Sequence, residues 1–193
     1  MAGFNNNRIG LLVLGLLLAG GLLFVYGRVF NEGTPGDYEI RKGNYRLEDG
    51  HHDQAVEEFE LALAKNPDHV GAHLGLALTR IQMAELDAAL ESLERTLALD
   101  PELGVAYANR GIVLDRLGRS EEALSDYERA LELDPRLAKG PGRLWRFLHN
   151  VDEKPPTIRD RAEYLKTELA KPPEQRLLRQ PSEDEKQRMY KID

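Results

Sequence analysis

A five-residue phrase occurs three times and decides the fold: Leu63-Ala-Lys-Asn-Pro67, Leu97-Ala-Leu-Asp-Pro101 and Leu131-Glu-Leu-Asp-Pro135. The prolines that close successive phrases are 34 residues apart. A fixed period of this length is typical of repeat arrays, in which each unit packs on its neighbours to form a continuous core. The stretch 37–137 is therefore predicted to contain three repeated units.

When the three units are aligned, the positions that match are small or apolar. They are Gly43, Ala77 and Gly111; Ala55, Ala89 and Ala123; Phe59, Leu93 and Tyr127; Ala62, Thr96 and Ala130; Leu63, Leu97 and Leu131; and Gly50, Ala84 and Gly118. Small residues let two antiparallel helices approach closely, and large apolar residues fill the space beside them. A glycine between helices tolerates positive φ, and a proline ends one helix and starts the next. Each unit is therefore predicted to be a helical hairpin.

This pattern resembles the tetratricopeptide repeat, a family of 34-residue helix-turn-helix units. The third unit carries the resemblance most fully, with Tyr107-Ala-Asn-Arg-Gly111, Leu117-Gly118, Glu122-Ala-Leu124, Tyr127, Ala130-Leu131 and Asp134-Pro135. The resemblance implies an all-α fold, a right-handed solenoid of three hairpins whose leading helices line an inner groove. It implies a protein that binds other proteins and is not an enzyme.

The first two units depart from the family pattern at several positions. Glu39 and His73 stand where the family has an aromatic residue, a position that only the third unit keeps aromatic. Arg46 and Arg80 replace a large apolar residue later in the same helix, and Ala84 replaces the turn glycine.

The helical periodicity predicts both the repeat helices and their ends. The expected helices span 37–48, 53–65, 68–83, 87–99, 102–117 and 120–133, with Ser120 as an N-cap. A further helix is expected over 157–170, with Thr157 as its N-cap and Asp160 completing a capping box.

The residues after the repeats are predicted to cap the array. We expect capping helices over 138–170, including a short helix over 143–150, and a charged tail over 171–193. The apolar stripe of helix 157–170 allows two dockings. It packs either on the trailing helix of the third repeat, which we favour, or in the groove near Ile112 and Leu78.

An uncharged apolar run extends from residue 9 to residue 27. At 1.5 Å per residue it is about 28 Å long, which is enough to cross a bilayer. We expect a short tail over 1–8, one transmembrane anchor over 9–30 and a linker over 31–36. A cleaved signal peptide ending near Ala19-Gly-Gly21 is the alternative and would give a secreted soluble adaptor. The expected location is the inner membrane of a bacterium, with the soluble part periplasmic or, alternatively, cytoplasmic.

Composition excludes several classes of protein. The 193 residues include 26 basic and 33 acidic ones, for a formal charge of −7. This balance does not favour nucleic-acid binding. The absence of cysteine excludes disulfides, thiolate catalysis, zinc–thiolate sites and a lipid-modified cysteine.

The candidate metal sites in the sequence all contain histidine. His69 and His73 are four residues apart, as are paired ligands on one helix face. We interpret His73 as a packing residue at the aromatic position of its repeat and His69 as a surface residue. His51-His52-Asp53 is interpreted as a turn with a helix cap. No metal, cofactor or catalytic residue is predicted, and a histidine metal site is a minor alternative.

The repeat geometry assigns ten residues to the inner groove. They are Ile40, Asn44, Leu47, Leu74, Leu78, Ile81, Val105, Ala108, Ile112 and Asp115. Some family members hold a C-terminal carboxylate with basic residues in this groove. Here the matching positions are mostly apolar, with Asn44 and Asn109 as partial matches, so that mode is not expected. An apolar groove favours an amphipathic helix or an extended apolar segment of a protein partner.

The sequence therefore predicts a membrane-anchored scaffold that assists the assembly or stability of an envelope or membrane complex. It does not identify the partner or the oligomeric state.

Overall fold

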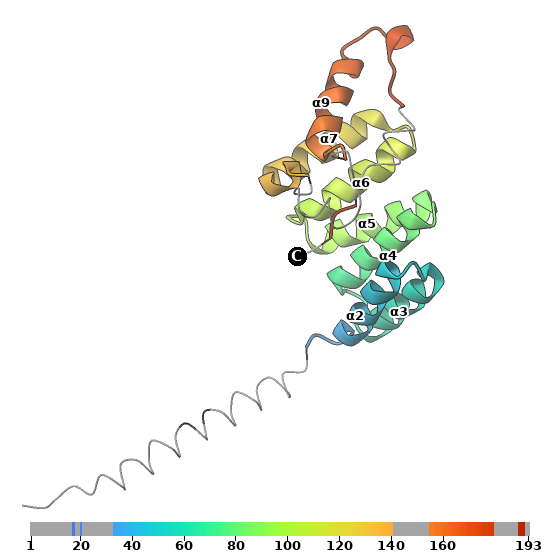
Figure 1. Ribbon diagram of the computed structural model, residues 1–193, viewed down its shortest axis with the longest axis vertical. Coiled ribbons are helices and arrows are strands. Elements are labelled where there is room, and N and C mark those ends of the chain that lie inside the picture. The colour runs from blue at the N-terminus through green and yellow to red at the C-terminus, as the bar shows by residue number, and fades with distance from the viewer. Residues whose placement is uncertain (1–16, 18–19, 21–32, 141–154, 180–188, 192–193) are drawn as a thin grey trace, which may run out of the picture. The chain divides into compact units, whose positions relative to one another are not determined.

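The computed structural model describes residues 17, 20, 33–140, 155–179 and 189–191 (Figure 1). The chain divides into two compact units, Met1–Pro35 and Gly36–Asp193. Apart from residues 17 and 20, the predicted anchor over 9–30 lies outside the described residues, and so does the predicted helix over 143–150. Within the described part of the chain, no helix has both the length and the apolar character needed to cross a membrane.

All regular structure described in the second unit is helical. The elements are α2 (Asp37–Glu48), α3 (His52–Lys65), α4 (Val70–Gln82), α5 (Leu86–Leu99), α6 (Gly104–Arg116), α7 (Ser120–Leu133), η1 (Pro135–Ala138), α9 (Ile158–Leu169) and η2 (Pro173–Gln175). The repeat helices begin and end within two residues of their predicted limits. One cap was predicted wrongly: Arg119 is the N-cap of α7, and the buried Ser120 is its first residue.

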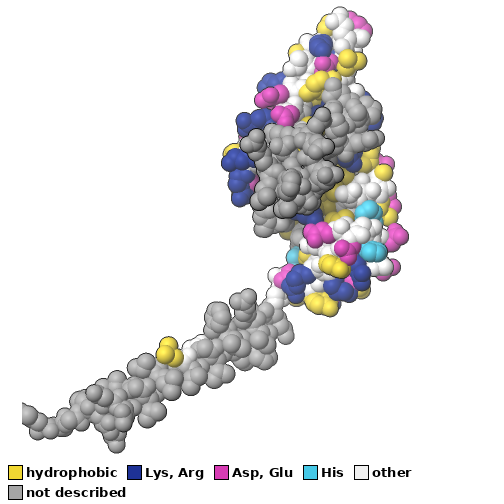
Figure 2. Space-filling model, in the orientation of Figure 1, with side chains coloured by type: hydrophobic (Ala, Val, Ile, Leu, Met, Phe, Trp, Pro, Cys, Tyr) yellow, Lys and Arg dark blue, Asp and Glu magenta, His cyan; other side chains and the backbone are white. Residues whose placement is uncertain are grey.

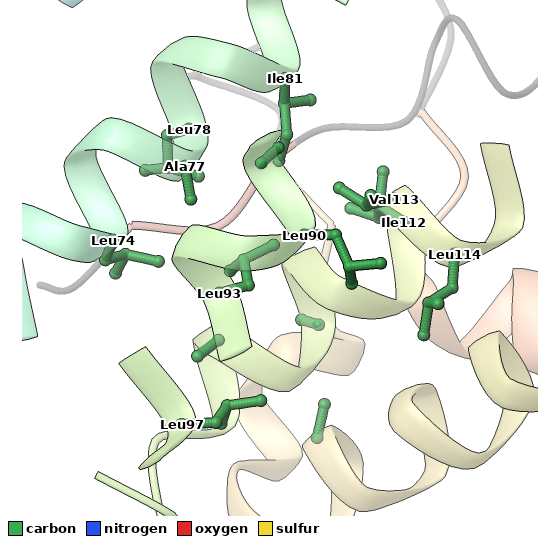
Figure 3. Close-up of a cluster of buried hydrophobic side chains, with 14 of the residues drawn as sticks. Leu74, Ala77, Leu78, Ile81, Leu90, Leu93, Leu97, Ile112, Val113 and Leu114 are labelled. Atoms are coloured by element: carbon green, nitrogen blue, oxygen red, sulfur yellow. The ribbon is translucent and has the colours of Figure 1, made fainter. Parts of the chain in front are cut away.

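The repeat helices pack as three antiparallel hairpins, α2 with α3, α4 with α5 and α6 with α7. Each trailing helix also packs on the next leading helix, so one core runs through the array. Figure 3 shows this core where leucine and isoleucine side chains of α4, α5 and α6 meet. Leading helices contact the next leading helix more extensively than trailing helices contact one another. The leading helices therefore form the inner face of the array.

A large ring enters the space left by glycines in two of the hairpins. A Cβ on Gly43 of α2 would lie 2.8 Å from the Phe59 ring, and one on Gly75 of α4 would overlap the same ring. In the third unit, a Cβ on Gly111 would lie 2.7 Å from the Tyr127 ring. These contacts explain why the leading helices have glycine here: any side chain would displace a fully buried aromatic ring.

The turn inside each hairpin has one geometry. Gly50, Ala84 and Gly118 have φ angles of 75°, 60° and 80°. In each case the next residue donates its N–H to a carbonyl five residues back, as Glu85 does to Arg80 at 2.9 Å. This is the Schellman arrangement, which satisfies the last carbonyls of a helix and requires a left-handed residue. Ala84 is the only non-glycine residue with positive φ in the described part of the chain.

Helix α9 packs against α7 and η1, where the leading helix of a fourth repeat would stand (Figure 1). Of the two dockings predicted for this helix, the structure shows the one on the trailing helix of the third repeat. Thr157 and Asp160 form the predicted capping box, with Thr157 N–H donating to Asp160 Oδ2 at 2.8 Å. Ile158 and Leu165 of α9 are fully buried and belong to the common core.

Candidate functional site

The ten residues predicted to line the groove all lie on leading helices, but they differ in exposure. Ile40, Asn44 and Val105 are partly exposed, and the other seven are buried. Asp115 differs most from the prediction, because it lies in a buried ion pair and not on an open surface. Its carboxylate accepts two hydrogen bonds from Arg161 of α9, at 2.5 and 2.8 Å.

The Asp115–Arg161 pair joins the leading helix of the third repeat to α9. Arg161 also donates to the carbonyl of Leu178 at 2.8 Å, and its guanidinium lies 5.2 Å from the ring of Tyr164. The Tyr164 hydroxyl donates to the carbonyl of Leu177 at 2.5 Å. The pair therefore has a structural role, since it holds α9 and the residues that follow it on the array.

The clearest recognition geometry on the inner face involves Asn109 of α6. Its side-chain Nδ2 donates to the carbonyl of Tyr190 at 2.7 Å, and its Oδ1 accepts the N–H of Tyr190 at 2.9 Å. A further bond from Nδ2 to the carbonyl of Val105, at 2.7 Å, fixes the amide on its own helix. One side-chain amide thus satisfies both backbone groups of a single residue, as a neighbouring strand does in a sheet.

This geometry requires the bound residue to lie outside a helix interior. In a helix interior the N–H and C=O of a residue are already bonded within the helix and cannot both face one amide. Tyr190 lies outside any helix, and both its N–H and its C=O pair with Asn109. The Asn109 amide therefore pairs with the backbone of a residue that is not in a helix interior.

The side chain of Tyr190 lies at the edge of a cavity of about 910 Å³. The cavity is bounded by the start of α6, by η1 and by the start of α9, through Leu103, Val105, Leu137 and Thr157. The Tyr190 hydroxyl lies 3.4 Å from the carbonyl of Leu137 and 3.4 Å from the N–H of Ile158. Both contacts are long and involve the hydroxyl, so they hold the Tyr190 side chain only weakly.

The next residue reaches the other end of the array. Lys191 Nζ lies 2.9 Å from Glu48 Oε1, at the end of α2. Both side chains are well exposed, so this ion pair contributes little to stability. It nevertheless shows that the side chain of Lys191 extends from the third unit toward the first.

The α2 end of the array carries a different surface. Tyr38, Arg41, Lys42, Tyr45 and Arg46 form one outward stripe around a shallow hollow, and Figure 2 shows basic and hydrophobic side chains together at this end. Most of the corresponding residues of α4 and α6 are buried. The first unit has no preceding hairpin among the described residues, so polar and aromatic side chains suit its end.

His69 and His73 have structural partners. His69 Nε2 lies 2.9 Å from Asp37 Oδ1, and its side chain is only 15% exposed, so it is not the surface residue predicted. His73 is partly exposed, and its Nε2 lies 2.9 Å from the carbonyl oxygen of Pro67. Among the described residues, no group of three or more potential ligands is placed to hold a metal ion.

Sequence reasoning missed the role of Tyr190 and used Asn109 only to argue against carboxylate binding. Two signals were present. Asn109 is a polar residue on the predicted inner side of α6, and Met189-Tyr190 is one of only two apolar pairs in a charged tail. Neither signal shows that the two segments, 81 residues apart, meet.

The second unit is thus a solenoid of antiparallel helix pairs with a peptide-sized site on its inner face. Comparison with known families agrees: residues 46–109 and residues 104–137 each match a family described as tetratricopeptide repeat. Residues 46–137 therefore match tetratricopeptide repeats, a non-catalytic family generally used in protein–protein interaction.

Solved structures share the fold. The first such domain of Spaghetti (RPAP3), bound to the HSP90 peptide SRMEEVD, is 21% identical, with a TM-score of 0.58, covering 72% of this chain and 97% of that one. A crystal structure of MamA is 20% identical over 74% and 81% of the two chains, with a TM-score of 0.52. The first domain of human RPAP3 is 26% identical over 53% and 80%, with a TM-score of 0.51. No curated protein sequence matches the chain.

Proposed function

We propose that this protein is a membrane-anchored adaptor that binds an extended segment of a partner protein along the inner face of its repeats. The observation that carries the proposal is the pair of hydrogen bonds between the Asn109 side chain and the backbone of Tyr190. They mark a place where the array holds a peptide backbone, whatever the side chains of that peptide.

The choice of an extended segment over an amphipathic helix follows from the same bonds. Asn109 needs a residue whose N–H and C=O are both free, and a helix offers such residues only at its ends. Additional support comes from Spaghetti (RPAP3), whose related domain was solved with a bound peptide. The partly exposed apolar residues Ile40 and Val105 then contact side chains that alternate along the segment.

Photo-crosslinking in the native membrane tests the binding site. A photoreactive amino acid at Val105, in chain extracted with its N-terminus intact, should capture a partner. Asn109→Ala should abolish that capture, whereas Arg159→Ala, on the outer side of α9, should leave it unchanged. Capture that persists in the Asn109→Ala protein, with unchanged melting temperature, would refute backbone recognition by Asn109.

The proposed anchor rests on the apolar run from residue 9 to residue 27. A spanning helix would place the array beside other membrane proteins, so its partner would belong to an envelope or membrane complex whose assembly or stability it assists. The soluble part is proposed to lie outside the cytoplasmic membrane.

Membrane extraction tests this second part. The chain should remain in the membrane fraction through washes with high salt and with carbonate, because burying the apolar run contributes far more than surface charge. Intact mass distinguishes the secreted alternative, since an uncleaved chain has a mass near 21.8 kDa. Release of the full-length chain by carbonate would contradict a spanning helix.

A further inference from the structure

We propose that the segment Met189–Lys191 is itself a ligand of the inner face, so that a partner must displace it before binding. The inference rests on the proposed function, because it assigns an internal competitor to the same site. Its basis is that Asn109, the residue proposed to hold a partner's backbone, already holds the backbone of Tyr190.

The contact has the character of recognition and not of incidental packing. Asn109 is fully buried and engages both backbone groups of one residue, 81 positions away in the chain. Met189 and Tyr190 both pack against the common core. The C-terminal tail is mostly charged, and its apolar pair Met189-Tyr190 lies on the inner face. Lys191 adds an ion pair with Glu48.

The segment also indicates the chemistry of a competing partner. It presents an aromatic residue beside Leu137 and Ile158, followed by a basic residue that meets a carboxylate of α2. We infer that the partner segment is extended, with an aromatic residue at the position bound by Asn109 and a basic residue next to it. The chain has a formal charge of −7, and this negative charge also favours a basic partner segment.

An attached ligand competes strongly even when each of its contacts is weak. Nine residues, 180–188, separate this segment from Arg179, and a short tether gives an effective concentration of the order of millimolar. For a free peptide with an intrinsic dissociation constant of about 100 µM, such a tether would raise the apparent constant roughly tenfold.

The test uses the full-length chain in detergent and two variants at one position. Tyr190→Pro removes the N–H that Asn109 accepts, whereas Tyr190→Phe keeps both backbone groups and removes the hydroxyl with its contacts at 3.4 Å. The probe is a fluorescent peptide with the sequence of residues 186–193, blocked at both ends, and its affinity is measured by anisotropy.

We expect the Tyr190→Pro protein to bind the probe roughly tenfold more tightly than the unmodified chain, and the Tyr190→Phe protein to bind it about as weakly as the unmodified chain. Adding Asn109→Ala to Tyr190→Pro should remove binding. Equal affinities for the unmodified and Tyr190→Pro proteins, both dependent on Asn109, would overturn self-occupation and leave the proposed function intact.

Two other outcomes also overturn the inference. If the probe binds none of the proteins, segment 189–191 is not a ligand, and the crosslinking experiment at Val105 decides the proposed function separately. A dimer that dissociates in the Tyr190→Pro protein, measured by sedimentation, would place the segment on the inner face of a second copy.

Discussion

Ala84 is a residue in a conformation that suits glycine. Its φ of 60° matches those of Gly50 and Gly118 in the other two turns, and a side chain there costs roughly 1 kcal/mol. We expect Ala84→Gly to stabilise the array by roughly 0.5–1 kcal/mol, measured as a higher midpoint of urea denaturation. Gly118→Ala should lower the midpoint by a similar amount. A lower midpoint for Ala84→Gly would contradict the left-handed turn.

Glu39 shows how a charged residue is accommodated at a position the family fills with an aromatic ring. Its carboxylate accepts a hydrogen bond from Lys65 at 2.8 Å, and this bond lowers the pKa of Glu39 below its ordinary value of 4.5. A lowered pKa in the folded state adds stability that is present above pH 4.5 and is lost as the pH falls through the lowered pKa. Glu39→Gln should therefore make the loss of stability below pH 4.5 less steep, as followed by melting temperature. An unchanged acid profile would mean that the Lys65 bond is not formed in solution.

At the scale of elements, α9 is attached to the array by both apolar and ionic contacts. Ile158 and Leu165 are fully buried, and Arg161 pairs with Asp115 in the interior. Removing one member of a buried ion pair leaves the other charged and unpaired, which costs about 3 kcal/mol or more. Arg161→Ala should destabilise the fold by about this amount in urea denaturation, while the exposed Arg159→Ala should have little effect. Equal midpoints for the two variants would show that the ion pair is open in solution.

The contact between the two helices of a hairpin can be tested in the third unit. Ala123 of α7 is fully buried, and its carbonyl oxygen lies 3.3 Å from where a Cβ on Gly111 would stand. Ala123→Trp should destabilise the array by at least roughly 1–3 kcal/mol, because a large ring cannot enter this contact. Glu122→Ala removes only an exposed ion pair with Arg119 and should be nearly silent. Similar melting temperatures would show that the helix faces are assigned wrongly.

At the scale of the whole molecule, the repeat period determined what could be predicted. The 34-residue spacing located six helices because the same small and large residues recur in every unit. Capping residues located α9, since Thr157 and Asp160 are a local signal. The Asn109–Tyr190 and Asp115–Arg161 contacts were not predictable, because each joins the repeats to a segment that does not repeat. Burial of Asp115 was missed for the same reason: the family pattern places its position on the inner face and contains no equivalent of Arg161.

The two ends of the array differ in how well they are covered, so unfolding is expected to begin at one particular end. At one end the α2 stripe leaves Tyr38 and Tyr45 about 60% exposed, and at the other end α9 covers α7. In a linear array each hairpin is stabilised only by its neighbours, so opening begins where a hairpin has the fewest of them. The first hairpin should therefore unravel first and most often, and the third should persist longest. Because the proposed binding site around Asn109 lies in the third hairpin, we expect a bound peptide to stay in place while the first hairpin is briefly open.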